Sequence, residues 1–294
     1  MTDPTRVDVS VLTPSLGYGR FVEDSILSVL HQEGISIQHI IQDAGSTDGT
    51  LEILHQYDHV VEWRSGQDNG QSDALNRALQ HARGRWIAWL NADEFYLPMS
   101  LAALVRHGDS TAADVVYGDD VFVDEEGKLS RLLPAHPFSL RILRLYGCFI
   151  PSSSTLFRRS SLPETPWDPD VRMMMDWDLY LRLASDGARF VNLDYPVGAF
   201  RRHRTQVTAR PSADFDDEYA RLFAKHGIDP SHRRWGTSLH RGSKLFSGAY
   251  ARQIRASRFR GRDVRWFRSD AGRQTFEALL RACYGRATST MKRA

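Results

Sequence analysis

The chain has 294 residues, of which 41% are hydrophobic and 25% are charged. This length and composition exclude a disordered or fibrous protein and suit one large α/β domain, alone or with a helical appendage. The apolar runs are too short for a membrane span of about eighteen residues, and the N-terminus lacks the apolar stretch of a secretory signal. Two cysteines are too few for a disulfide framework or a zinc site, so we expect a cytoplasmic protein.

The charge is divided unevenly along the chain. Residues 1–232 hold 22 Lys and Arg against 33 Asp and Glu, whereas residues 233–294 hold 16 against 3. The net charge of +2 therefore combines an acidic front of −11 with a basic tail of +13. A chain divided in this way is expected to present two different surfaces.

Strands and helices alternate over the first hundred residues. Apolar patterning predicts strands at 7–13, 39–41, 60–63 and 86–90. Helical spacing of apolar residues predicts helices at 22–30, 51–57 and 75–82. This alternation predicts an open α/β fold with a mostly parallel central sheet, and the nearly wholly apolar strand 86–90 suits burial on both faces of it.

The second half of the chain gives fewer signals. A hairpin is expected from 115–123 with its turn at 125–127, and helices are expected around 139–146 and 176–185. The softest boundary lies near 211–235, where Pro211, Pro230 and the change of charge occur. The predicted organisation is a catalytic domain over 1–230, with halves of about 1–115 and 116–230, followed by a basic helical extension over 231–294.

Three polar segments follow the expected strands, at the carboxyl ends where an open α/β sheet binds its ligand. They are residues 13–15, 43–46 and 91–94. In the second, Asp43 precedes a small-residue turn and a helix start, which suits the approach of a nucleobase, although a plain helix cap explains it equally well. The acidic segment 91–94 fits a site for Mg²⁺ or Mn²⁺ completed by phosphate and water; a solvated loop is the alternative.

A further carboxylate stands at the start of a helix. Trp177, Tyr180 and Leu181 are spaced to face the core, so Asp176 falls in the first turn of the expected helix. The helix dipole keeps a carboxylate ionised there, which suits a general base. Capping of the helix alone also explains an Asp at this position.

Taken in order, these segments carry a resemblance to a known family. The matching runs are Thr-Pro-Ser at 13–15, Asp-Ala-Gly-Ser-Thr-Asp-Gly-Thr at 43–50, Asp-Asn-Gly-Gln-Ser-Asp-Ala-Leu-Asn at 68–76, Trp-Leu-Asn-Ala-Asp-Glu at 89–94 and Met-Asp-Trp-Asp-Leu at 175–179. The chain resembles family 2 glycosyltransferases over residues 7–210. These are inverting enzymes with the Rossmann-like GT-A fold. Residues 115–119 and 151–159 also look like a subgroup that builds bacterial surface polysaccharides, including O-antigen.

The resemblance implies a role for each site residue. The catalytic base would be Asp176, and the metal ion, Mn²⁺ or Mg²⁺, would be held by Asp93 and by His203 of an Arg-x-His stretch. The nucleotide would be held by Thr13, Pro14, Ser15, Asp43, Gly45, Ser46, Asn69, Gly70, Asp73, Asn91 and Ala92. Within this set Asp43 would accept from the uracil N3–H. Two positions depart from the family pattern: Asn91 stands at the first Asp of the Asp-x-Asp element, and Glu94 replaces the frequent following Asp.

The implied reaction is transfer of a sugar from a nucleotide diphosphate, with UDP-sugar expected, to a lipid-linked or polysaccharide hydroxyl. A divalent cation stabilises charge on the leaving diphosphate, and one carboxylate takes the acceptor proton. Direct attack turns an α-linked donor into a β-linked product. The alternatives are a sugar nucleotidyltransferase and a non-catalytic nucleotide- or nucleic-acid-binding protein. An NAD-linked enzyme is disfavoured because no third glycine follows Gly17 and Gly19.

The basic tail has two interpretations. One apolar helical stripe is flanked by Arg273, Arg281 and Arg286; its members are Phe276, Leu279, Leu280, Cys283 and Tyr284. The stripe either packs on the catalytic domain or lies on the anionic inner face of the plasma membrane. The tail has no recognisable zinc, helix-turn-helix or RNA-binding motif, so a nucleic-acid partner is not expected.

Overall fold

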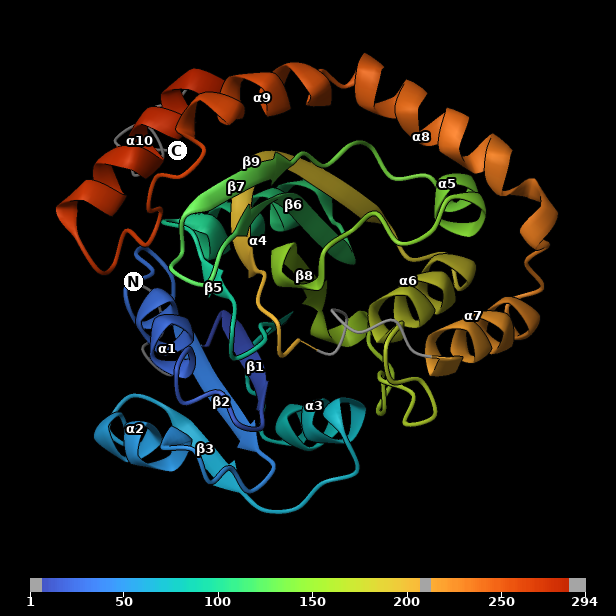
Figure 1. The fold of residues 1–294 in the computed structure, drawn as a ribbon. Helices are drawn as coiled ribbons and strands as arrows, with labels where there is room; N and C mark the ends of the chain where they lie inside the picture. Colours follow the sequence, from blue (N-terminus) through green and yellow to red (C-terminus); the bar gives the residue numbers. More distant parts are fainter. Residues whose placement is uncertain (1–6, 207–212, 286–294) are drawn as a thin grey trace.

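A computed structural model describes residues 7–206 and 213–285. Within these residues nine strands form one sheet (Figure 1). The strands are β1 Val9–Ser15, β2 Ile37–Asp43, β3 Glu62–Ser65, β4 Trp86–Trp89, β5 Phe95–Tyr96, β6 Val115–Val123, β7 Leu129–Leu133, β8 Thr155–Arg158 and β9 Phe190–Arg201. Their order across the sheet is β3-β2-β1-β4-β8-β6-β9-β5, with β7 paired to the free part of β6.

Helices cover both faces of this sheet. They are α1 Val22–Leu30, α2 Thr50–Gln56, α3 Gln71–Gln80, α4 Ser100–Thr111, α5 Leu140–Leu145, α6 Met175–Ser185, α7 Ala213–Lys225, α8 Arg233–Phe246, α9 Ala249–Ala256 and α10 Asp270–Tyr284. Each helix in the described part of the chain is too short or too polar to cross a bilayer.

The two halves of the sheet pair differently. Strands β3, β2, β1 and β4 are parallel neighbours, as the βα alternation predicted. Beyond β4 the pairing is mixed, because β8 runs antiparallel to both β4 and β6, whereas β6 and β9 are parallel. The hairpin expected after 115–123 is confirmed as β6 and β7, whose close turn requires antiparallel pairing. The expectation of a mostly parallel sheet therefore describes the first half, and the sheet as a whole is mixed.

The alternation of side chains along β1 explains the layers. Val9 and Val11 belong to the core on one face, where α4 and α10 pack. Leu12 points to the opposite face and joins a core made with α3, α5 and α6. Successive residues of a strand face opposite sides of the sheet. Because β1 has apolar residues facing each side, both faces of the sheet are buried under helices.

The described part of the C-terminal extension packs against the rest of the chain. Phe276, Leu279, Leu280 and Cys283 of α10 are at most 4% exposed and join the same core as α4. The indole Nε1 of Trp266 donates to the backbone carbonyl of Tyr96 over 3.0 Å. The packing alternative for the apolar stripe is thus confirmed, and the interpretation that places this stripe on a membrane is wrong. Arg286 and Pro211 lie outside the described residues.

Candidate active site

The strand ends named from the sequence meet at one edge of the sheet. Ser15 of β1 is in register with Asp43 of β2, and Asp43 is in register with Ser65 of β3. Parallel strands in register bring the loops that follow them together. The edge expected to bind the nucleotide is therefore assembled from three separate loops.

The Asp43 carboxylate organises its own turn. Gly45 has a φ of +90°, a conformation that disfavours side chains, and this lets the chain fold back so that Gly45 N and Ser46 N each donate to Asp43 Oδ2 over 2.9 Å. The hydroxyls of Ser46 and Ser65 also donate to this carboxylate, over 2.5 and 2.7 Å. Asp43 thus fixes the shape of the pocket edge, and its contact with uracil stays a prediction.

The end of β1 offers one unused hydroxyl. Thr13 Oγ1 lies 2.9 Å from His39 Nε2 of β2, so this hydroxyl is engaged inside the sheet, and Pro14 is buried beside it. Ser15 Oγ is buried, and none of the described residues forms a hydrogen bond with it. Of the Thr-Pro-Ser run, Ser15 is therefore the residue whose side-chain polar atom has no partner among the described residues.

The loop before α3 is closed by Asp73. Asn69 N donates to Asp73 Oδ2 over 2.9 Å, and Arg77 Nη2 lies 2.7 Å from the same oxygen. Gly70, with a φ of +106°, forms the step into the helix. Gly70 N donates to Asp68 Oδ1 over 2.9 Å, so both backbone N–H groups of the Asn69–Gly70 step are engaged within the loop, and its contact with the nucleotide stays a prediction.

Within the turn after β4, most polar groups are already engaged. Asn91 Oδ1 accepts from Gln71 Nε2 over 2.6 Å and from Trp89 Nε1 over 2.8 Å, so the oxygen that could touch a metal is occupied. Ala92 is buried in the core between α1 and α2. Glu94 accepts from Asn91 N, and burial together with the charges of Asp93 and Asp120 raises its pKa well above the usual range.

Asp93 meets the second residue expected at the metal. His203 Nε2 lies 2.8 Å from Asp93 Oδ2, although 110 residues separate them. His203 is held from behind by Thr205 Oγ1, 2.7 Å from Nδ1, and by the ring of Phe21, whose centroid is 4.8 Å away. The chain brings together the two side chains that the sequence assigned to a cation.

The donor set fits a divalent cation completed by a ligand. Asp93 Oδ2 and His203 Nε2 lie 2.8 Å apart and would together hold one ion. Carboxylate and imidazole are both accepted by Mn²⁺. Among the described residues no group of three His, Cys, Asp or Glu side chains could hold a metal by itself. The remaining ligands would have to come from diphosphate and water.

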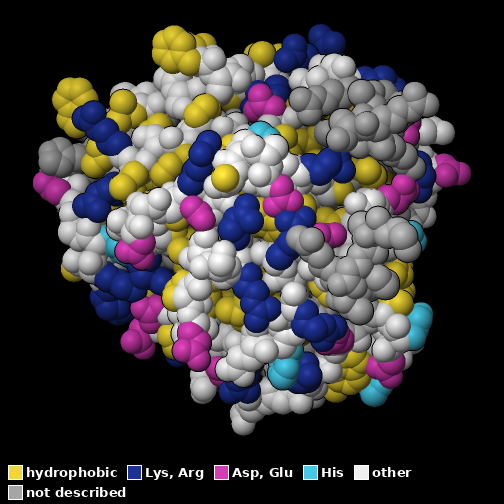
Figure 2. Space-filling view, turned by 180° about the vertical axis from the view of Figure 1, so that it is seen from behind, with side chains coloured by type: hydrophobic (Ala, Val, Ile, Leu, Met, Phe, Trp, Pro, Cys, Tyr) yellow, Lys and Arg dark blue, Asp and Glu magenta, His cyan; other side chains and the backbone are white. Residues whose placement is uncertain are grey.

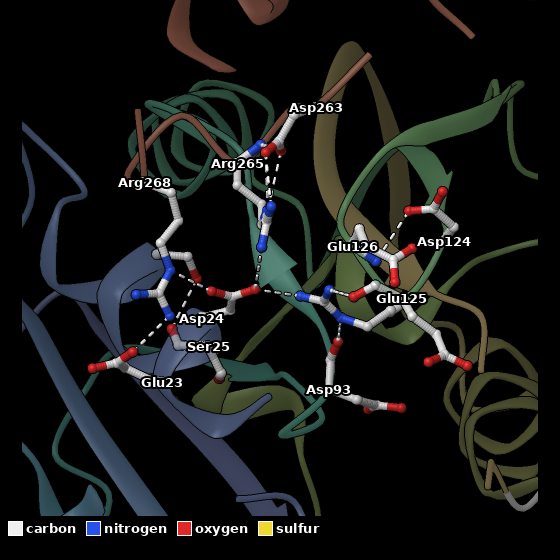
Figure 3. Close-up of polar contacts among 12 residues, drawn as sticks. Glu23, Asp24, Ser25, Asp93, Asp124, Glu125, Glu126, Asp263, Arg265 and Arg268 are labelled. Atoms are coloured by element: carbon white, nitrogen blue, oxygen red, sulfur yellow. Dashed lines mark hydrogen bonds and ion pairs between the residues drawn. The ribbon is translucent and has the colours of Figure 1, made fainter. Parts of the chain in front are cut away.

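Arg201 supports this pair and was missed by the sequence analysis. Its guanidinium is fully buried and donates to the Asp93 carbonyl over 2.9 Å and to the Glu125 carbonyl over 2.6 Å. A third nitrogen reaches Asp24 Oδ2 over 2.6 Å. Figure 3 shows Arg268 of the extension also directed at Asp24. The Arg-x-His stretch could have pointed to Arg201 as a site residue, because Arg201 is its first residue.

Asp176 lies in the first turn of α6 without a cationic partner in the described chain. Its Oδ1 accepts from Trp177 N over 2.7 Å, and the Cys148 thiol lies 3.6 Å from Oδ2. Burial raises the pKa of Asp176 to about 6. Asp178, two residues on, is instead bound by Arg182, Lys225 and His226, each 2.8 Å away. Of the two carboxylates, Asp176 is therefore the one that can accept a proton near neutral pH.

Comparison with known proteins gives a family match. The model of Glycosyl transferase family 2 matches residues 10–165. A putative teichuronic acid biosynthesis glycosyltransferase of Bacillus subtilis, TuaG, is 41% identical over 92 residues, which are 29% of this chain and 36% of that protein. The chain thus aligns with about a third of the length of this relative.

Solved structures share the fold over most of the chain. The structure of S. aureus TarS 1–349 in complex with UDP-GlcNAc matches with a TM-score of 0.58 and 15% identity, covering 94% of this chain and 82% of that one. Mannosyltransferase PcManGT from Pyrobaculum calidifontis, in complex with GDP-Man and Mn²⁺, matches with a TM-score of 0.52 and 18% identity, covering 99% and 79%. At these identities the likeness shows the fold, and the expected GT-A fold is confirmed.

Proposed function

Since the chain belongs to glycosyl transferase family 2, we propose that it is an inverting, metal-dependent enzyme that transfers a sugar from a UDP-sugar. The acceptor is a hydroxyl of a lipid-linked or polysaccharide chain in bacterial surface glycan synthesis, and the enzyme works on the cytoplasmic side of the membrane. The donor class is supported by TarS, which was solved with UDP-GlcNAc. The acceptor class is supported by TuaG, which is named for teichuronic acid biosynthesis.

The donor nucleotide binds at the edge formed by the first three strands. Ser15 contributes a buried hydroxyl that has no hydrogen-bond partner among the described residues, and Asp43 holds Gly45 and Ser46 in a turn beside it. Asp43 also accepts a hydrogen bond from the uracil N3–H, which replaces its short hydrogen bond from the Ser46 hydroxyl. The backbone of the Asn69–Gly70 step faces the ribose and diphosphate.

The Asp93–His203 pair is the observation that carries the proposal. A carboxylate and an imidazole 2.8 Å apart at the carboxyl edge of a sheet suit a cation that also needs phosphate oxygens. A divalent ion bound there stabilises the negative charge that grows on the departing diphosphate. Arg201 keeps the Asp93 backbone in place, and Thr205 keeps the imidazole oriented.

Asp176 removes the proton from the acceptor hydroxyl. No arginine or lysine of the described chain neutralises it, and burial raises its pKa to about 6, so it is ionised but still basic at neutral pH. Its proton leaves with the solvent after transfer. Because the acceptor oxygen attacks the anomeric carbon directly, the configuration inverts and no covalent enzyme intermediate forms.

The test is a binding and product assay on the whole chain. A panel of UDP- and GDP-sugars is screened by thermal unfolding with Mn²⁺ and with EDTA, since a ligand that binds the native state raises the melting temperature. The stabilising donor is then incubated with glycan acceptors, and NMR reports the anomeric configuration. We expect stabilisation that requires Mn²⁺ and a β-linked product from an α-linked donor. Equal stabilisation in EDTA would contradict the proposed dependence on a metal ion. An α-linked product would contradict the inverting mechanism.

A further inference from the structure

The outer side of helices α8 and α9 exposes large apolar side chains. Trp235, Leu245, Phe246 and Ile254 are between 66% and 92% exposed. A scattered exposed apolar residue needs no explanation, but four large ones on two consecutive helices do. We call this surface, with the arginines described next, the α8–α9 face.

The same face is basic. From Pro230 to Arg262 the sequence contains no Asp or Glu. Arg241 of α8, Arg255 of α9 and Arg258 of the short 3-10 helix after α9 are exposed, and in the described part of the chain none of them has a carboxylate within ion-pair distance. Arg252, on the inner side of α9, is instead buried against Asp119 at 3.1 Å. The basic side chains that the structure describes on this segment are thus divided between a packed inner side and an unpaired outer side.

The shape of the face argues against a protein partner. Helices α8 and α9 follow one another along the outer rim of the molecule (Figure 1), and Figure 2 shows hydrophobic side chains projecting from the upper edge with Lys and Arg beside them. The four exposed apolar side chains project from this rim. The pocket beside it, between α9 and α10, is lined by Arg252, Arg255 and Arg281, which do not suit an apolar anchor residue. A second copy of the chain would bring arginine against arginine, which disfavours a symmetric dimer.

We propose that the α8–α9 face docks on the surface of an anionic lipid bilayer. Apolar and aromatic side chains enter the boundary between headgroups and acyl chains, where no complementary pocket is required, while arginines beside them contact anionic headgroups. This partner matches both the chemistry and the shape of the face. The inference rests on the proposed function only for its purpose, which is to bring the enzyme to a membrane-borne acceptor; the docking itself is independent of catalysis.

The expected size of the effect follows from the two contributions. An arginine near an anionic membrane strengthens binding by about fivefold, so three together give about a hundredfold. Phe246 and Ile254 each add about tenfold if half of the side chain leaves water. The electrostatic part falls at high salt, because the Debye length is about 3 Å at 1 M.

The experiment is co-sedimentation of the full chain with vesicles of phosphatidylglycerol and phosphatidylcholine at 1:1, and with pure phosphatidylcholine, in the absence of donor. We expect binding to the mixed vesicles, loss of about a hundredfold in the triple variant Arg241→Glu, Arg255→Glu, Arg258→Glu, and loss of at least tenfold in Phe246→Ser, Ile254→Ser. The matched control is Phe215→Ser, Arg221→Glu on α7, which makes the same kinds of change at exposed positions elsewhere and should bind like the wild type.

The proposal is overturned if the wild type stays in solution with mixed vesicles, if the α7 control loses binding as much as the α8–α9 variants, or if those variants bind unchanged. Sedimentation velocity is measured in parallel. A wild-type dimer that the Phe246→Ser, Ile254→Ser variant converts to monomer would assign the face to a second copy instead. Donor binding measured by thermal unfolding reports separately on the proposed function, so either proposal can fail while the other stands.

Discussion

Two groups of carboxylates in this protein differ in what they contact. At the expected active site, Asp93 faces an imidazole and Asp176 faces a thiol. Where the extension meets the catalytic domain, the carboxylates face guanidinium groups. Asp119 binds Arg252 at 3.1 Å, and Asp24 binds both Arg201 at 2.6 Å and Arg268 at 2.7 Å.

The difference separates structural from chemical carboxylates. A buried carboxylate paired with arginine is neutralised within the protein, and removing either partner leaves an uncompensated charge. A carboxylate without a guanidinium partner can still take up a cation or a proton. The acidic front and basic tail seen in the sequence are joined by such pairs, whereas Asp93 and Asp176 of the expected site have no arginine or lysine partner in the described chain.

The largest effect is expected from Asp176→Asn. The substitution keeps the size of the side chain and removes the proton acceptor, so kcat should fall by about 10²–10⁴-fold while donor affinity and melting temperature persist. The matched control is Asp178→Asn, two residues away. Because Asp178 is bound by Arg182, Lys225 and His226, its loss should reduce stability and leave the chemical step nearly unchanged. Near-normal kcat in Asp176→Asn, measured by UDP release, would show that another carboxylate is the base.

The next largest effect is expected from breaking the Arg252–Asp119 ion pair between the extension and the rest of the chain. Arg252→Ala leaves Asp119 buried without its cation, and the free energy of unfolding should fall by about 3–5 kcal/mol. Arg255→Ala, three residues along the same helix and exposed, should change it by less than about 0.5 kcal/mol. Urea unfolding of both variants measures the contrast. Equal stability of the two would mean that the Arg252 contact contributes nothing to holding the extension.

Arg201 contacts both Asp24 of the paired carboxylates and the backbone of Asp93 at the expected site, so substituting it should weaken metal binding. Arg201→Lys keeps a positive charge beside Asp24 but cannot donate at the same time to the carbonyls of Asp93 and Glu125. We expect Mn²⁺ affinity in the presence of UDP to fall by about 10–100-fold. Calorimetry measures this without turnover. Unchanged affinity would show that Asp93 is positioned without help from Arg201.

The smallest predicted effect concerns pH. The pKa of Asp176 is about 6, so kcat should be full well above pH 6 and fall as the pH drops through that value and the base becomes protonated. The Cys148 thiol donates to the ionised carboxylate and lowers its pKa, so Cys148→Ala should move the acidic limb upward by less than about one pH unit. A pH–rate profile of the two proteins measures the shift. A shift of the acidic limb of the profile to lower pH in Cys148→Ala would contradict the hydrogen bond that the thiol donates to the Asp176 carboxylate.

The sequence predicted local structure well in the first half of the chain. The apolar periods gave β1, β2 and β4 and the helices between them, because each strand and helix buries one repeating set of side chains. It did not predict α4, a twelve-residue helix, or β5, a two-residue strand. It also did not predict α9, where exposed Ile254 and buried Arg252 contradict the usual pattern of burial. Helix α9 is stabilised by an ion pair across 133 residues, and no local pattern encodes such a contact.

The candidate site was likewise predicted from the sequence only in part. The sequence by itself determined the nature and order of the candidate groups, since Asp93, Asp176 and His203 could be named from short motifs. Only the tertiary structure decided that His203 contacts Asp93, that Asn91 is engaged by Gln71, and that the α10 stripe is buried. The physical reason is that a motif fixes the chemistry of a side chain and its local backbone, whereas its partner is chosen through space by strand order and packing.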